Sequence, residues 1–315
     1  MAHSPAADLP PTLPALHPPA ADLPPTLPAL HRRVLDWYAV QARALPWRLR
    51  HATPWGVFLS EVMAQQTPVA RIEPVWLEWM ERWPTPVDLA AATRGDVVRA
   101  WGRLGYPRRA LRLHEAATAM VERHGGEVPG TVDELRALPG VGDYTASAVA
   151  CFAFGIPATV VDTNVRRVLA RTLRGAPCAA PSLTQSERHL ADSAMPPDTD
   201  HANTWNVAAM ELGALVCTAR APRCDDCPVA DLCAWNLAGR PAYEGPPRRG
   251  QSWHGSDRQA RGALLTVLRE AGGGVPAARL AQAWPDEPQR TRCLDSLVAD
   301  GLVERLRHDR FRLPA

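Results

Sequence analysis

Lysine is absent from this chain, because all 35 basic side chains are arginine. Without a side-chain amine, the protein cannot form a lysine Schiff base or make a Walker-type lysine contact with a phosphate. Any mechanism that needs a nucleophilic lysine is therefore excluded. The formal net charge is only +2, too small to indicate nucleic-acid binding unless the arginines gather in a local patch.

Long apolar runs and secretion signals are also missing from the sequence. No stretch has the length needed to cross a bilayer, and no basic segment followed by an apolar run marks a signal peptide near residue 1. The seven cysteines are four clustered and three scattered residues, which does not resemble a secreted disulfide framework. We expect a cytoplasmic protein with reduced thiols and no membrane partner.

The chain divides by composition into four stretches. Residues 5–17 (PAADLPPTLPALH) are repeated without change at 19–31, and such a proline-dense repeat predicts a disordered duplicated tail over residues 1–30. Residues 31–240 show apolar positions at helical spacing almost throughout. A linker is expected at 241–256, followed at 257–315 by three helices and a hairpin around His308 and Asp309, a winged-helix-like module. The predicted fold class is all-α.

Four cysteines stand close together in the last third of the chain, at Cys217, Cys224, Cys227 and Cys233. Their spacing, with six, two and five residues between them, fits no regular helix or strand, so a loop must carry them around a group that accepts four thiolates. The candidates are an iron–sulfur cluster and a tetrahedral zinc. Zinc sites are usually built from two separated pairs, and only one C-x2-C pair is present, so we favour the cluster.

Three further features carry chemistry, and each also has an ordinary structural explanation. The turn LPGVG (138–142) exposes backbone N–H groups ahead of a helix, as a phosphate-gripping hairpin does, although a plain glycine turn reads the same. Asp162 begins a helix, where aspartate is a favoured N-cap, yet its carboxylate could also stabilise positive charge at a sugar C1′. Glu61 lies among apolar neighbours; if buried, its raised pKa would suit it to deliver a proton.

In combination these motifs resemble the adenine DNA glycosylases of the MutY type, within the helix-hairpin-helix family that includes endonuclease III. The resemblance runs from about Leu35 to Leu237, two-thirds of the chain. The motifs that carry it are LPW (45–47), SEVMAQQT (60–67), LGY (104–106), LPGVGDYTASA (138–148), VDTNVRRV (161–168) and the cysteine quartet.

The resemblance implies a bilobal glycosylase domain and a role for each matching residue. The hairpin lobe would span about 54–165, and the cluster lobe would combine 31–53 with 166–240. Glu61 matches the acid that protonates adenine, Asp162 the carboxylate that stabilises the oxocarbenium ion, and Asn164 the residue that orients the attacking water. Tyr144 stands where bifunctional relatives carry their Schiff-base lysine. The remaining implied residues are the duplex wedges Gln66 and Tyr106, the phosphate-binding turn of Leu138, Gly140, Val141 and Gly142, the backbone-facing Arg220 and Arg223, and the four cysteines as ligands of a [4Fe-4S] cluster.

The chain departs from the family pattern at three points. Thr163 stands where the family commonly has glycine, and Pro107 replaces a second tyrosine after LGY. The region after residue 245 does not resemble the Nudix-like domain that many relatives use to recognise 8-oxoguanine.

The implied function is hydrolysis of the N-glycosidic bond of adenine opposite 8-oxoguanine or guanine, by a monomer on double-stranded DNA and without lysine-based strand cleavage. Thymine removal from T:G mismatches on the same scaffold is the nearest alternative, since such relatives can carry tyrosine at position 144. A non-catalytic DNA-binding protein and an electron carrier are the alternatives from other classes. The cluster is expected to be structural, because four ligands leave no open position.

Overall fold

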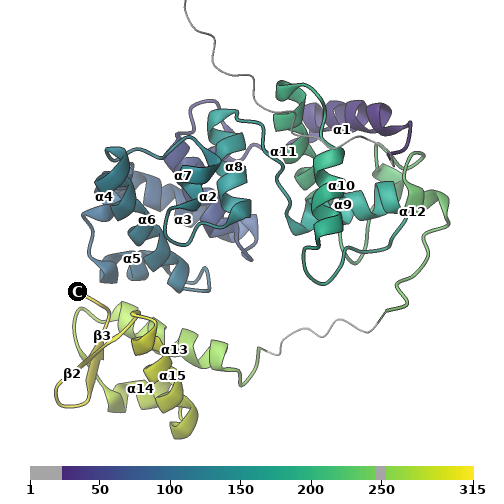
Figure 1. Ribbon diagram of the computed structural model, residues 1–315. Coiled ribbons are helices and arrows are strands. Elements are labelled where there is room, and N and C mark those ends of the chain that lie inside the picture. Colours follow the sequence, from purple (N-terminus) through teal and green to yellow (C-terminus); the bar gives the residue numbers. More distant parts are fainter. Residues whose placement is uncertain (1–22, 246–252) are drawn as a thin grey trace, which may run out of the picture. The chain divides into compact units, whose positions relative to one another are not determined.

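The computed structural model describes residues 23–245 and 253–315 (Figure 1). These residues form two compact units. The first unit combines residues 23–42 with 159–243, and the second combines 43–158 with 244–245 and 253–315. Most of the predicted tail and the middle of the predicted linker (246–252) lie outside the described residues. The predicted division of residues 31–240 into a hairpin lobe (about 54–165) and a cluster lobe (31–53 with 166–240) stays a prediction.

The regular structure of the first unit is helical, and two separate segments of the chain form this unit. They are α1 (Leu27–Gln41), α9 (Thr163–Arg174), α10 (Gln185–Ser193), α11 (Thr199–Leu215), the 3-10 turn η2 (Cys224–Asp226) and α12 (Ala234–Leu237). The helix α1 already begins at Leu27, so the end of the second repeat is helical. Leu30 and Val34 of α1 are fully buried against α11 and join one apolar core with α9. The N-terminal segment is therefore held to the unit by burial of apolar surface.

The second unit begins with eight short elements that surround a core rich in tryptophan. They are η1 (Pro46–Arg48), α2 (Pro54–Ala64), α3 (Val69–Arg82), α4 (Pro86–Ala90), α5 (Arg94–Trp101), α6 (Arg108–His124), α7 (Val132–Arg136) and α8 (Asp143–Phe154). Nine of the eleven residues of α2 are buried, because α3, α6 and α8 all pack against it. Eight of the eleven tryptophans in the chain are buried and belong to the apolar cores.

The C-terminal module (257–315) belongs to the second unit and has a core of its own. Its elements are α13 (Asp257–Glu270), β1 (Val275–Pro276), α14 (Ala277–Ala283), α15 (Glu287–Ala299), β2 (Glu304–Leu306) and β3 (Arg310–Arg312). The strands form an antiparallel sheet in the order β1-β3-β2. The hairpin turns at His308 and Asp309, the position that the sequence predicted. Both residues have positive φ. Three helices and this hairpin match the predicted winged-helix arrangement.

Strands elsewhere are missing from the described residues, in agreement with the predicted helical fold. Within these same residues, no helix combines the length and apolar character that a membrane span requires.

Candidate active site and cluster loop

The hairpin turn joins α7 to α8 and leaves backbone amides accessible at the start of α8. Leu138 is buried and anchors the turn, while Gly140 has φ +77° and lies close to α6. A Cβ on Gly140 would stand 2.8 Å from the Cβ of Arg112, so only glycine fits here. Gly142 is the N-cap of α8, and a Cβ there would meet open space. The first turn of α8 therefore presents N–H groups and the positive end of a helix dipole.

Glu61 and Tyr144 meet within the second unit. Glu61 lies on α2 and is only 8% exposed, and the Tyr144 hydroxyl on the first turn of α8 donates a hydrogen bond of 2.9 Å to its Oε2. Directly after α2, Nε2 of its C-cap residue Gln65 donates to Thr145 Oγ1 at 3.1 Å. These two pairs, from α2 and from its C-cap, hold the carboxyl group next to the hairpin turn. A buried carboxyl group with a fixed partner is suited to proton delivery.

Asp162 and Asn164 meet within the first unit, at the start of α9. Asp162 is the N-cap: its Oδ1 accepts from the Val165 amide at 2.7 Å, and its Oδ2 accepts from Asn164 Nδ2 at 2.6 Å. Burial raises the pKa of the Asp162 carboxyl, and these hydrogen bonds partly oppose the rise. The capping role and the proposed chemical role therefore use the same carboxylate, and the two interpretations do not exclude each other.

Arg167 connects this carboxylate to the cysteine loop, a link that the sequence interpretation missed. Its guanidinium donates to Asn164 Oδ1 at 2.7 Å and to the Cys217 carbonyl at 2.6 Å. It also donates to the Gly213 carbonyl of α11 at 2.7 Å. The only signal in the sequence was the i,i+3 spacing of Asn164 and Arg167 on one helix. The remaining partners come from the tertiary fold.

Gln66 and Tyr106 lie in two neighbouring loops with unusual backbone geometry. Both have positive φ, +57° and +46°, which is uncommon for residues other than glycine, and both side chains are exposed. Arg109 on α6 holds the two loops together: it donates to the carbonyls of Gln65 at 2.5 Å and Gly105 at 3.0 Å. Burial lowers the pKa of Arg109 to about 10. Strained exposed residues over a fixed support are typical of contact sites.

All four cysteines of the loop line one cavity in the first unit. Apolar side chains of Val168, Leu212 and Trp235 form much of the remaining wall. Burial, together with the neighbouring thiols, raises the pKa of Cys227 to about 11, so an anionic thiolate there needs a cationic partner.

Arg171 supplies a cation beside the cysteines. It is 3% exposed, donates to Cys217 Sγ at 3.3 Å and to the Thr218 carbonyl at 2.8 Å, and lies 4.7 Å from the Trp235 ring. Four sulfur ligands around an apolar cavity, with a buried positive charge beside them, fit an iron–sulfur cluster. Bound there, the cluster would hold the loop in its folded form.

Arg220 and Arg223 lie on the same loop and are both exposed. Arg223 donates to the Leu215 carbonyl at 2.7 Å and stands 3.9 Å from Asp226, so it also supports the loop. Arg220 has no hydrogen bond or ion pair with other described residues. Of the three scattered cysteines, Cys151 and Cys293 are buried, whereas Cys178 is half-buried.

Comparison with known proteins gives the class of this fold. Residues 59–191 match the model of the HhH-GPD superfamily of base excision DNA repair proteins, and residues 217–233 match the iron–sulfur binding domain of endonuclease III. Two solved structures are similar in fold: a thermostable thymine-DNA glycosylase (TM-score 0.61, 25% identity, 68% of this chain and 97% of that one) and a trapped endonuclease III–DNA covalent intermediate (TM-score 0.56, 27% identity, 67% and 97%). The chain is thus a base excision DNA glycosylase with a [4Fe-4S] site.

Similarity to whole proteins narrows this class. The adenine DNA glycosylase of Mycobacterium tuberculosis is 53% identical over 283 residues, covering 89% of this chain and 92% of that protein. The human adenine DNA glycosylase is 44% identical over 64% of this chain and 38% of its own length. The thymine-DNA glycosylase of Aeropyrum pernix is 34% identical over 65% and 92%. The chain belongs to the adenine DNA glycosylase family.

The coverage of these matches also bears on the C-terminal module. The match to the mycobacterial protein includes part of the module, because 89% of 315 residues is about 280 and the module begins at residue 257. The human match is shorter, at 213 residues.

Proposed function

We propose that this protein hydrolyses the N-glycosidic bond of adenine mispaired with 8-oxoguanine or guanine in duplex DNA, leaving an abasic site. The observation that carries the proposal is the buried Glu61 carboxyl group held by Tyr144 beside the hairpin turn. A base within a duplex cannot be reached by such a buried group, so the adenine must leave the stack before it reacts.

DNA binding comes first in the proposed sequence of events. The amides around Gly140 and Gly142 would hold a phosphate, and Leu138 and Val141 would shape that turn. Arg220 and Arg223 would add backbone contacts from the cluster loop. Gln66 and Tyr106 would enter the duplex beside the oxidised guanine, which partly unstacks neighbouring bases.

Bond cleavage follows from the two carboxyl groups. Protonation of adenine by Glu61 makes the base a better leaving group, and the electron pair of the C1′–N9 bond departs with it. The Asp162 carboxylate stabilises the positive charge left at C1′, with Asn164 fixing its orientation and that of the attacking water. Water adds at C1′ and loses a proton, giving the abasic sugar. The cluster supplies no chemistry in these steps and holds the 217–233 loop in place.

Substitution of Glu61 by glutamine tests the acid role. We expect Glu61→Gln to slow single-turnover adenine release by at least about 100-fold, the lower range for a general acid, with DNA affinity within about threefold of wild type. Glu78→Gln on α3, an exposed carboxyl group, is the matched control and should behave as wild type. Near-normal release by Glu61→Gln would remove Glu61 from the mechanism.

Thymine removal from T:G mismatches remains the second candidate, because one relative of similar coverage is named a thymine-DNA glycosylase. Release assays on A:8-oxoguanine, A:G and T:G duplexes separate the two activities. The first two duplexes should react and the third should not. A protein that binds all three without releasing any base would instead be a non-catalytic DNA-binding protein.

Strand cleavage should be absent, since Tyr144 occupies the position of the Schiff-base lysine in bifunctional relatives and the chain has no lysine. Borohydride treatment during the reaction should trap no covalent DNA adduct beyond the background from the terminal amine. A trapped adduct that persists after the terminus is blocked would contradict this. We further propose that the protein acts as a monomer in the cytoplasm, on nucleoid DNA.

A further inference from the structure

The C-terminal module is docked on α5 and α6 through a shared apolar core. Val98 of α5 and Leu111 of α6 are buried in one cluster with Leu265, Leu268 and Leu313 of the module. Apolar side chains that are buried only when two parts meet stabilise their association. The module is therefore an integral part of the second unit.

Backbone and charge contacts fix the orientation of this docking. Arg99 Nε donates to the Arg269 carbonyl at 3.2 Å, and Arg269 Nε donates back to the Val98 carbonyl at 3.1 Å. Burial lowers the pKa of Arg269 to about 10. Arg108 on α6 forms an ion pair of 3.4 Å with Asp300 of the module. These two reciprocal hydrogen bonds, each from an arginine to a main-chain carbonyl group, fix the register of α13 on α5.

Gly95 of α5 lies close to the C-terminal end of the module. A Cβ added there would lie 2.4 Å from the Pro314 carbonyl oxygen, a distance at which the backbone must move. A side chain at position 95 would thus separate the module from α5. Gly262 on α13 offers the opposite case, because a Cβ there would meet nothing within 4 Å.

The docked module brings Arg258 to the Tyr106 loop. The Arg258 guanidinium lies 5.2 Å from the centre of the Tyr106 ring, and that of Arg109 lies 5.7 Å from it. Tyr106 is 42% exposed and has φ +46°, so its conformation needs outside support. A guanidinium over a tyrosine ring supplies such support.

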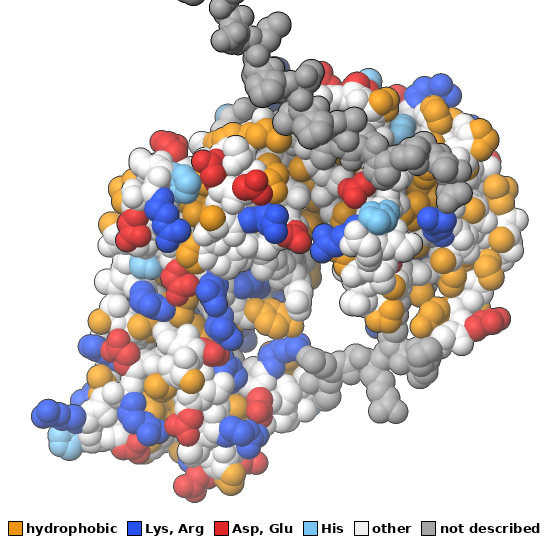
Figure 2. Space-filling view, viewed as in Figure 1, with side chains coloured by type: hydrophobic (Ala, Val, Ile, Leu, Met, Phe, Trp, Pro, Cys, Tyr) orange, Lys and Arg blue, Asp and Glu red, His pale blue; other side chains and the backbone are white. Residues whose placement is uncertain are grey.

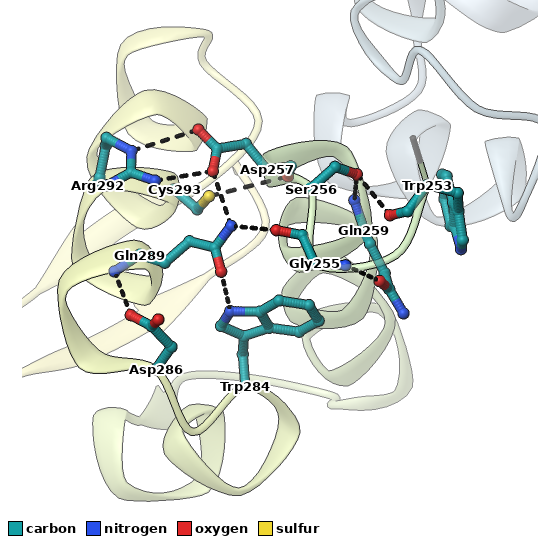
Figure 3. A network of polar contacts seen from close by, with 10 residues as sticks. All are labelled: Trp253, Gly255, Ser256, Asp257, Gln259, Trp284, Asp286, Gln289, Arg292 and Cys293. Atoms are coloured by element: carbon teal, nitrogen blue, oxygen red, sulfur yellow. Dashed lines mark hydrogen bonds and ion pairs between the residues drawn. The ribbon is translucent and has the colours of Figure 1, made fainter. Parts of the chain in front are cut away.

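The polar network in Figure 3 fixes the first turn of α13. Arg258 is the second residue of that helix. Ser256 caps the helix, and Asp257 pairs with Arg292 at 2.9 Å and accepts from Gln289 at 2.9 Å. Hydrogen bonds from Arg292 and Gln289 lower the pKa of Asp257 to about 2. The first turn of α13 is therefore tied to α15, and Arg258 has a rigid base.

The charge of the module does not indicate bulk attraction to DNA. Its ten arginines are offset by eight acidic residues, and Figure 2 shows both signs interspersed over it. Any contribution to DNA binding must come from particular side chains.

We propose that the C-terminal module acts in DNA binding by positioning Tyr106, with Arg258 as the positioning residue. This rests on the proposed function, in which Tyr106 enters the duplex. A ring held in place before binding loses less conformational freedom when it is inserted between bases. The module thereby prepares the protein for the mispaired duplex.

A double-mutant cycle tests the coupling between Arg258 and Tyr106. The Kd for an A:8-oxoguanine duplex is measured in the Glu61→Gln background, so that no product forms. Arg258→Ala should weaken binding about two- to fivefold, the range expected for an exposed to partly desolvated cation–π contact. The same change should have no effect when Tyr106 is already alanine. Arg258→Lys should restore part of the affinity, and Arg279→Ala on α14, an exposed arginine of the same module, should change nothing.

Undocking the module gives an independent test. Gly95→Val should weaken binding as much as Arg258→Ala, and the two changes together should not add, whereas Gly262→Ala should bind as wild type. An Arg258→Ala loss that persists without Tyr106, or normal binding by folded Gly95→Val, overturns the proposal. If Gly95→Val does not fold, the Arg258 cycle decides alone. Failure of the proposed function would look different: wild-type protein would release no adenine, while the coupling in DNA binding would remain.

Discussion

At the level of single residues, three arginine side chains join segments that lie far apart in the sequence. Arg109 joins the two loops of Gln66 and Tyr106, Arg167 joins Asn164 to the cysteine loop, and Arg171 lies buried beside Cys217. Each uses several N–H groups of one planar guanidinium, which an ammonium group with three donors on a flexible stem could not match. The absence of lysine thus costs the fold nothing at these positions.

The acid limb of the pH–rate profile should report on Asp162. In the proposed mechanism this group is ionised when it stabilises the cation, and burial has raised its pKa, so the rate should fall as the pH drops through that raised value. The hydrogen bond from Asn164 opposes the rise. In Asn164→Ala we therefore expect the acid limb to move to higher pH, together with a lower plateau rate.

Single-turnover rates between pH 4 and pH 8 measure this shift. Thr163→Ala, next in sequence and exposed, is the control and should leave the limb in place. An acid limb that stays fixed or moves to lower pH in Asn164→Ala would show that Asn164 does not act on the Asp162 carboxylate.

Sequence motifs predicted the candidate site residues that belong to a recognisable pattern. They did not predict the residues whose importance depends on contacts in the folded protein. Glu61 and Tyr144 were named from separate motifs, and a hydrogen bond joins their side chains in the structure. Arg109 lies in none of the motifs, and Arg167 lies within VDTNVRRV, where the motif gives it no role. Most of their partners are main-chain carbonyl groups, and a carbonyl is the same in every residue, so no sequence pattern marks it.

At the level of elements, α9 and α11 pack together, and Gly213 of α11 lies directly against Asn164 of α9. A Cβ on Gly213 would stand 2.7 Å from the Asn164 Cβ and 3.0 Å from its Cα. Gly213→Ala should push Asn164 away from Asp162, reducing adenine release at least about tenfold and lowering the free energy of unfolding by about 1–3 kcal/mol, as overpacking does.

Thermal unfolding and single-turnover assays check both effects of Gly213→Ala. Gly262→Ala makes the same change at an open helical site, and it should stabilise by roughly 0.5–1 kcal/mol with an unchanged rate. A Gly213→Ala protein with wild-type rate would mean that the helix pair relaxes without moving Asn164.

Element boundaries were predictable where periodicity or capping residues marked them. The first of the three helices expected in 257–315 spans Asp257–Glu270 behind the Ser256 cap, and the hairpin lies around His308 and Asp309 as predicted. The strand β1 was missed, because two residues are too few to show alternation. It exists because Val275 pairs with Phe311, a contact far away in sequence.

For the molecule as a whole, the order of segments along the chain hides which parts belong together. The module follows the first unit in sequence but is grouped with the second. Val98 and Leu111 read as ordinary inward-facing helix residues, and only the structure shows that their partners come from the module. Docking between distant surfaces depends on shape, which single-sequence patterns do not record.

Removal of the cluster should therefore affect the two units unequally. The free energy of cluster binding stabilises the folded form of the 217–233 loop. Arg171 of α9 donates hydrogen bonds to that loop and so links the two segments. After iron chelation under reducing conditions, hydrogen exchange should accelerate in 217–233, α9 and α12, while α2 and α8 stay protected. Cys227→Ser should reproduce this pattern. Cys178→Ser, in the same unit but outside the quartet, should not. Exchange that accelerates first or equally in α2 and α8 would show that the cluster supports the whole protein, against the division into separately stabilised units.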